Sequence, residues 1–215
     1  AECPSVCEHL HLPVQSGDDT VLRRMGRQYT IEHYQERLAR IREAVPGIAI
    51  STDVIVGFCG ETEAQFESTL ALLEAVRYDQ VFAAAYSPRP GTPATKLADD
   101  VPPDVKRRRL NELLARQEAI GLERNRAWLD REVEVLVEAV TPPRSHEHAD
   151  ADAPTSAPPA RDRSSDVRLS GRTRGSKLVH LTGPVELVGR FVPVRIDHAG
   201  PYALRGRTIG SPAGA

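Results

Sequence analysis

The sequence is poor in cysteine, in net charge and in long hydrophobic runs, and each shortage narrows the possible classes of protein. Its 215 residues contain three cysteines and carry a formal net charge of −2 at pH 7. An odd and sparse set of cysteines argues against a disulfide scaffold and favours a reducing compartment such as the cytoplasm. The balanced charge does not mark the chain as a whole as nucleic-acid binding.

No apolar run approaches the roughly 18 to 20 residues that span a membrane, and no signal-peptide pattern is visible. We therefore expect no membrane partner. With 40% hydrophobic residues, the chain can bury a substantial core and is long enough for one medium domain and one small domain. It begins at Ala1 without an initiator methionine, directly before a strand-like run, which suggests a portion of a longer protein.

The first 130 residues alternate short β-type runs with amphipathic helical runs, which is typical of βα units and a parallel sheet. Thr30 is placed as an N-cap, and Thr62 with Gln65 has the spacing of a capping box. The run 48–58 is almost wholly apolar or β-branched, as expected for a strand covered on both faces. Three such strands fall short of the eight of a complete barrel. The expected strands are 9–17, 48–58 and 78–87, and the expected helices are 18–25, 31–45, 63–77 and 103–129.

Residues 131–210 have a different composition, with short strand-like runs and Gly-rich turns that are typical of a small β-barrel. The expected strands are 133–140, 167–174, 177–183, 189–200 and 202–210. An insertion at about 143–166 has almost no large apolar residue and is expected to be disordered. Its polar residues either hold a metal weakly or keep a linker in solution; they are His146, Glu147, His148, Asp150 and Asp152.

Positive charge gathers in the C-terminal part of the chain. Residues 161–210 contain ten Arg or Lys against four Asp or Glu. On neighbouring strands and turns these cations would share one barrel face, where backbone phosphates of RNA are their natural partners. The predicted RNA-binding residues are Arg172, Arg174, Lys177, Arg205 and Arg207. A second basic run, Arg107 to Arg109, is either a solvated helix face or a further surface for RNA.

Four motifs occur in an order that resembles one enzyme family. They are "HLPVQSG", "DVIVGFCGETEAQFE", "AYSPRPGTPA" and the basic "GRTRGSKLVHL". In this order they resemble the radical S-adenosylmethionine (AdoMet) methylthiotransferases, and the loop "SPRPGTP" is similar to the branch that modifies tRNA. The resemblance covers nearly the whole chain apart from the insertion.

The resemblance implies an α/β fold in which a partial (βα) radical SAM barrel is followed by a small all-β, OB-like barrel. Residues 1–130 would be the C-terminal half of the radical barrel, and 131–210 a TRAM domain that binds RNA. The intact enzyme would add a methylthio group to a modified adenosine in the anticodon arm of tRNA, using AdoMet and two [4Fe–4S] clusters, and we expect a monomer. The chain by itself is expected to be inactive.

Two other functions remain open at this point. The first is an RNA-binding module without catalysis, since the chain has the basic tail but no loop that matches the cluster motif. The second is a methylthiotransferase that acts on a ribosomal protein or on threonylcarbamoyl-adenosine in tRNA.

The resemblance places cofactor-binding residues at the carboxyl ends of the three predicted strands, where parallel α/β folds bind ligands. The predicted residues are Gln15, Ser16, Ile55, Gly57, Gly60, Glu61 and Arg89. Each has a plainer alternative. The polar pair at 15–16 and the two glycines would also suit tight turns, Glu61 would stabilise its loop or cap a helix, and Arg89 would be a surface arginine. Cys59 stands where the family commonly has proline, and packing is the expected role of its thiol.

Cys3 and Cys7 have the first spacing of the C-x3-C-x2-C loop that binds the cluster in this family, but Leu10 occupies the third ligand position. A cluster that leaves one iron free for AdoMet needs three cysteines. We interpret the two cysteines as unrelated to that loop, and the ligands of both clusters as absent from this chain.

This interpretation predicts that anaerobic reconstitution of the chain with iron and sulfide yields no stable [4Fe–4S] absorbance, because a third thiolate is missing. Ultraviolet–visible spectra and iron analysis provide the measurement. A stoichiometric cluster that disappears when Cys3 and Cys7 are replaced by serine would contradict it.

Overall fold

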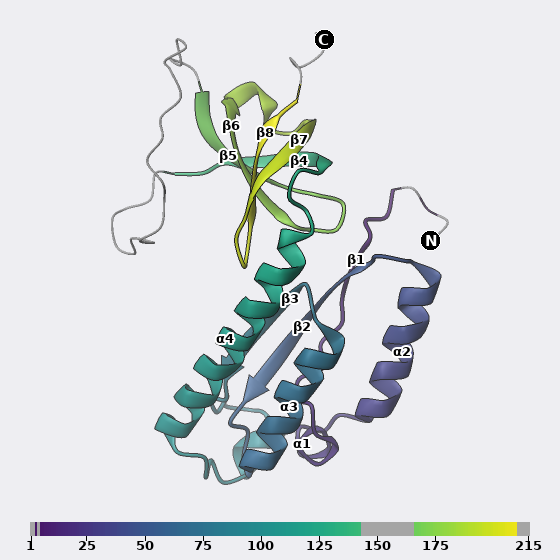
Figure 1. Ribbon diagram of the computed structural model, residues 1–215. Helices are drawn as coiled ribbons and strands as arrows, with labels where there is room; N and C mark the ends of the chain where they lie inside the picture. The colour runs from purple at the N-terminus through teal and green to yellow at the C-terminus, as the bar shows by residue number, and fades with distance from the viewer. Residues whose placement is uncertain (1–2, 4, 143–165, 210–215) are drawn as a thin grey trace. The chain divides into compact units, whose positions relative to one another are not determined.

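The computed structural model describes residues 3, 5–142 and 166–209 (Figure 1). The chain forms two compact units. The first contains the chain as far as Ala127 together with Gly200–Tyr202, and the second contains Trp128–Ala199 and the residues from Ala203 onward. The insertion predicted to be disordered lies, except for Asp166, outside the described residues, and so do its histidines.

The first unit contains a three-stranded parallel sheet in the order β1-β2-β3. This part of the predicted α/β fold is confirmed. The first strand is shorter than predicted because Pro13 lacks an N–H to donate and Gln15 adopts a left-handed backbone with φ 70°. The strands are β1 His9–His11, β2 Ala49–Val56 and β3 Gln80–Ala85, and the helices are α1 Asp19–Arg24, α2 Ile31–Ala44, α3 Glu63–Val76, the 3-10 turn η1 Pro93–Lys96, and α4 Pro103–Arg126.

The predicted helix starts are confirmed. The Thr30 hydroxyl accepts a hydrogen bond from the backbone N–H of His33 at the start of α2. At the start of α3, the Thr62 hydroxyl accepts from the Gln65 N–H, while the Gln65 side chain accepts from the Thr62 N–H. Both caps satisfy backbone donors that have no partner inside the helix.

The helices cover one face of this sheet. Alternate residues of β2, among them Val54 and Val56, are buried in a core with residues of α2, α3 and α4. The opposite face, which we call the open face, was predicted to be covered along 48–58, and the residues of β2 on it are buried or half-buried. It is more exposed at β3, where Phe82 is 51% exposed. The open face consists of His9, His11, Ala49, Ser51, Asp53, Ile55, Gln80, Phe82 and Ala84.

The second unit is a closed five-stranded barrel in the order β4-β5-β6-β8-β7. The predicted OB-like barrel is confirmed. Residues alternate along each strand between a buried interior position and an exposed position, as in β7, where Val192, Val194 and Ile196 are buried. The elements are β4 Glu132–Val140, β5 Asp166–Arg172, β6 Leu178–Pro184, the 3-10 turn η2 Val185–Leu187, β7 Phe191–Ala199 and β8 Leu204–Thr208.

Close packing of β4 against β5 depends on Gly171. A Cβ at this position would lie 2.2 Å from the backbone oxygen of Leu136, an atom that cannot rotate away. At Gly183, on β6, an added Cβ would meet the Leu187 Cδ1 at 3.0 Å, and that side chain is flexible. Neither glycine has a positive φ, so the two sites differ only in what surrounds them.

We predict that Gly171→Ala lowers the free energy of unfolding by about 2 kcal/mol or more, because overpacking against backbone forces the strands apart. Gly183→Ala is the matched control and should cost less than half as much. Trp128, the only tryptophan, packs against the barrel core, so its fluorescence during urea unfolding measures both. Equal losses for the two variants would contradict the steric argument.

Candidate functional site

Three loops follow the strands at one edge of the parallel sheet, which we call the carboxyl edge. In the first loop, the Gln15 N–H donates to the Asp53 carbonyl and its own carbonyl accepts from the Ile55 N–H, both at 2.9 Å. The Ser16 hydroxyl is buried, 3.5 Å from the Thr69 hydroxyl of α3. These contacts favour the turn alternative for Ser16. Its role toward a cofactor stays a prediction.

The second loop, Gly57–Glu61, leaves β2 through two glycines in the left-handed region, with φ 69° at Gly57 and 72° at Gly60. A Cβ on the first would lie 2.4 Å from the Lys106 Cγ, and one on the second would lie 2.8 Å from the Arg24 Nη1. The space beside Gly57 is therefore filled by the aliphatic part of the Lys106 side chain, and the space beside Gly60 by the Arg24 guanidinium. The observed backbone supports the tight-turn alternative, and an approach of adenine to these glycines stays a prediction.

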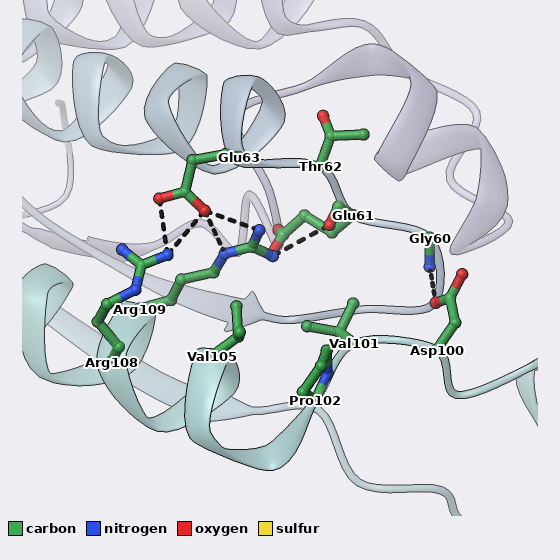
Figure 2. A pocket seen from close by; sticks show the side chains of 10 residues that line it. All are labelled: Gly60, Glu61, Thr62, Glu63, Asp100, Val101, Pro102, Val105, Arg108 and Arg109. Atoms are coloured by element: carbon green, nitrogen blue, oxygen red, sulfur yellow. Dashed lines mark hydrogen bonds and ion pairs between the residues drawn. The ribbon is translucent and has the colours of Figure 1, made fainter.

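A buried ion pair attaches this loop to α4, as Figure 2 shows. The Glu61 Oε2 accepts from the Gly57 N–H at 2.6 Å and from the Arg109 Nη1 at 2.8 Å. The same guanidinium donates to the Glu61 carbonyl at 3.1 Å and, through Nη2, to the Glu63 Oε2 at 2.9 Å. The side chains of Glu61 and Arg109 are 1% and 4% exposed. The loop is thus closed on itself and fixed to the helix by one carboxylate.

The electrostatics of the two glutamates differ because their exposure differs. Burial raises the pKa of Glu61, although the Gly57 N–H and the Arg109 guanidinium oppose the rise. Its Oε1 is buried without a hydrogen-bond partner among the described residues. Hydrogen bonds from Arg108 and Arg109 lower the pKa of Glu63, which is half exposed. Arg109 therefore stabilises a carboxylate that its surroundings disfavour.

A cavity of about 400 Å³ lies beside this ion pair. Figure 2 shows the loop and α3 on one side of it and α4 with its preceding segment on the other. The Asp100 carboxylate accepts from the Gly60 N–H at 2.6 Å at one end. The prediction of a solvated basic face at Arg107 to Arg109 is wrong for Arg109, which is 3% exposed and committed to the two glutamates.

A chain of hydrogen bonds on the open face was missed at the sequence level. The Ser51 hydroxyl lies 3.0 Å from the His9 Nε2 and 2.9 Å from the His11 Nδ1, and the His11 Nε2 lies 3.3 Å from the Asp53 Oδ2. The donor and acceptor roles along this chain of hydrogen bonds depend on the tautomers of His9 and His11. The sequence did contain a signal for this arrangement. Polar residues occur two apart on each of two adjacent strands, at positions 9 and 11 and at positions 51 and 53.

Two predicted cofactor residues lie apart from this chain of hydrogen bonds. Ile55 is on the open face, half-buried, and pairs with Ala84 of β3. Arg89 is exposed in the loop after β3, where its carbonyl accepts from the Thr92 N–H and hydroxyl. The side chain of Arg89 contributes to none of the ion pairs described above, and its role stays a prediction.

The predicted RNA-binding cations occupy two sides of strand β6. Arg172, on β5, donates to the Ser176 carbonyl at 3.0 Å and lies 3.4 Å from Glu138. Arg174 is exposed in the turn between β5 and β6. Lys177 is 8% exposed because the turn folds back, with its N–H donating to the Thr173 hydroxyl. The inclusion of Lys177 on an exposed face is thus corrected.

The other two predicted cations share one carboxylate. Arg205 and Arg207 of β8 lie 3.4 and 3.0 Å from the two oxygens of Asp197. Arg195 of β7, which sequence reasoning missed, stands directly opposite Arg207 and reaches Asp130 only at 3.8 Å. We call Arg195, Arg205 and Arg207 the arginine cluster. Strand register brings its members together, and the sequence offered only the alternation of β7 as a signal.

The cysteines do not fit a cluster of the kind that the resemblance implies. Cys3 and Cys7 are exposed, and Cys59 is buried in an apolar group with Val21 and Phe58, as packing predicts. Within the described ranges no three His, Cys, Asp or Glu side chains are arranged to hold a metal ion. Among the described helices, none is both long and apolar enough to cross a bilayer.

Comparison with known proteins first gives a family match over the beginning of the chain. The model of the radical SAM superfamily matches residues 1–73, which include β1, β2 and the loop after each. The match agrees with the parallel βα arrangement of the first unit.

Comparison with individual proteins is more specific than the superfamily match. Proteins named tRNA-2-methylthio-N(6)-dimethylallyladenosine synthase are similar over almost the whole chain: 41% identical over 208 residues in Acetivibrio thermocellus, covering 97% of this chain and 39% of that protein, and 43% over 204 residues in Moorella thermoacetica, covering 95% and 41%. The chain spans about two-fifths of the length of these curated relatives. Its homologues are tRNA methylthiotransferases with a radical SAM domain, and it matches their C-terminal portion. The resemblance read from the motifs is confirmed.

We predict that Arg109→Leu lowers the free energy of unfolding of the first unit by about 3 to 5 kcal/mol, because it leaves the Glu61 carboxylate buried and unpaired. The pKa of Glu61, already raised by burial, should rise further. A carboxyl with a raised pKa stabilises the fold below its unfolded pKa and loses that contribution as pH rises through its folded pKa. The loss should therefore be larger at about pH 7.5 than at about pH 5.

Two further variants test the cause by urea unfolding followed by circular dichroism. Arg108→Leu breaks only the exposed pairs with Glu63 and Glu112 and should cost under about 1 kcal/mol. Glu61→Gln added to Arg109→Leu should recover part of the stability, since the amide oxygen still accepts from the Gly57 N–H. A double variant no more stable than Arg109→Leu would mean that lost packing, not the buried charge, causes the defect.

Proposed function

We propose that this chain is the C-terminal portion of an enzyme that adds a methylthio group to N(6)-dimethylallyladenosine, next to the anticodon of tRNA. The observation that carries the proposal is the 41% identity over 97% of the chain to a synthase named for that product. Two features support it: a ligand-binding edge in a parallel sheet, and a separate barrel with clustered arginines.

The first unit would form part of the AdoMet pocket. Purely parallel sheets are normally covered on both faces, whereas the open face here carries a half-buried Ile55 and an exposed Phe82. Such a face, next to the carboxyl edge, suits an apolar and aromatic ligand. When bound, AdoMet supplies the methyl group and the radical-forming carbon. The role of this chain is to orient it, with Glu61 and Arg109 holding the loop rigid.

The barrel would bind the anticodon arm through the arginine cluster. Like charges directly opposite each other on paired strands are destabilising, and Arg195 faces Arg207. The nearby acids Asp197, Asp130 and Glu132 offset part of this repulsion. An RNA phosphate would reduce the remaining repulsion, and the arginines would displace counterions from the RNA. With tRNA as substrate, we place the protein in the cytoplasm and expect it to act as a monomer.

The test is nucleoside mass spectrometry of tRNA from cells that lack the gene. We expect loss of the methylthio group from N(6)-dimethylallyladenosine, accumulation of the unthiolated nucleoside, and recovery when the gene is returned. Loss from threonylcarbamoyl-adenosine instead would assign the other tRNA substrate. An unchanged set of tRNA nucleosides would contradict the proposal and favour a non-catalytic RNA-binding module or a ribosomal-protein substrate.

A further inference from the structure

The start of β7 presents an aromatic side chain to solvent. Phe191 is 63% exposed, while the alternate residues Val192, Val194 and Ile196 are buried in the barrel. Its ring therefore lies on the outer surface, on the side of the strand away from the core. The described core contacts of the barrel do not include Phe191, so stability of the core does not explain why a large aromatic residue stands here.

Strand register gives this ring apolar neighbours. Phe191 pairs with Leu136 of β4, which is half-buried, and Pro193 stands two residues further along β7 on the same exposed face. Leu136 in turn pairs with Arg172 of β5. Three strands thus carry Phe191, Leu136 and Arg172 in one row, with the Cα atoms of Phe191 and Arg172 about two strand spacings, or roughly 10 Å, apart.

The arginine cluster lies on the other side of the ring. Arg195 is four residues from Phe191 on the same face of β7, roughly 13 Å along the strand, and it stands opposite Arg207. The apolar surface is therefore flanked by guanidinium groups in two directions. The acidic residues nearest to it in the register are all on β4: Glu132 and Glu134, which pair with Arg195 and Pro193, and Glu138, two residues beyond Leu136 and 3.4 Å from Arg172.

We propose that Phe191, supported by Leu136 and Pro193, is a stacking platform for one unpaired base of RNA, while Arg172 and the arginine cluster contact phosphates on either side. This inference rests on the proposed RNA-binding function and adds the requirement for a single-stranded segment. Base stacking on an aromatic ring is tolerant of sequence and combines with cationic grooves in OB-type domains.

The size and charge of the surface favour RNA over a protein partner. A stable protein interface buries about 800 Å² on each side, whereas three neighbouring side chains can cover little more than one base. Flanking arginines suit phosphates, and they would cost desolvation in an apolar interface. The base in a paired stem is not available to the ring, so binding through the platform requires an unstacked nucleotide.

The experiment measures binding of the 215-residue chain to a fluorescent single-stranded RNA of about ten nucleotides, within the site sizes of OB folds, by anisotropy at several salt concentrations. We expect Phe191→Leu to weaken binding by about 5- to 100-fold, the range for loss of one stacked base, without changing the salt dependence. Phe191→Tyr should bind like the parent chain because it retains the ring. Val188→Ala, an exposed apolar residue in the preceding turn, is the matched control and should have no effect.

A second pair of measurements separates this inference from the proposed function. Replacing Arg195 and Arg207 by alanine should lower both the affinity and the slope of affinity against salt, because fewer counterions are released. If that variant loses binding and Phe191→Leu does not, the platform is wrong and RNA binding by the barrel stands. If neither variant changes binding, both the platform and the RNA-binding role of the barrel are wrong. Trp128 fluorescence verifies that every variant is folded.

Discussion

The buried ion pair between Arg109 and Glu61 is the contact on which the carboxyl edge of the first unit depends. One carboxylate receives the N–H that closes the loop after β2 and the guanidinium that comes from α4. Burying two charges costs solvation that the pair barely recovers, and a well-packed apolar pair would be at least as stable. What the ion pair supplies is position: it joins a loop with two left-handed glycines to a long helix at a single orientation.

Local sequence signals predicted the elements of this unit well, but contacts between distant residues escaped them. The caps at Thr30 and Thr62 could be predicted because each involves residues within one turn of helix. The role of Arg109 could not, since its partner is 48 residues away. Three consecutive arginines look alike in a sequence, yet successive residues on a helix point about 100° apart, and this rotation leaves Arg107 exposed while Arg109 is buried.

In the barrel, too, contacts between distant residues could not be predicted from local sequence patterns. Arg205 and Arg207 were predicted to lie on a barrel face because cations gather on neighbouring strands and turns, and both are exposed on β8, where alternate residues face outward. The prediction that Lys177 is exposed was wrong because this residue lies in a turn. Alternation does not apply there, and the backbone folds back onto Thr173. Arg195 was missed because its importance comes from facing Arg207, and register between strands is set by the whole barrel.

The two units pair their cations differently, and this difference bears on the proposal that the barrel binds RNA. In the first unit the arginines on α4 meet acids of the same unit: Arg116 pairs with Glu74, and Arg124 binds Asp79 through two nitrogens. In the second unit Arg205 and Arg207 share the carboxylate of Asp197. Internal partners neutralise a cation and also hold it in place, so it has little to gain from a phosphate. Arg205 and Arg207 are more exposed, at 64% and 82% of their side chains. In the proposed function, these exposed cations are therefore the ones that a phosphate would reach.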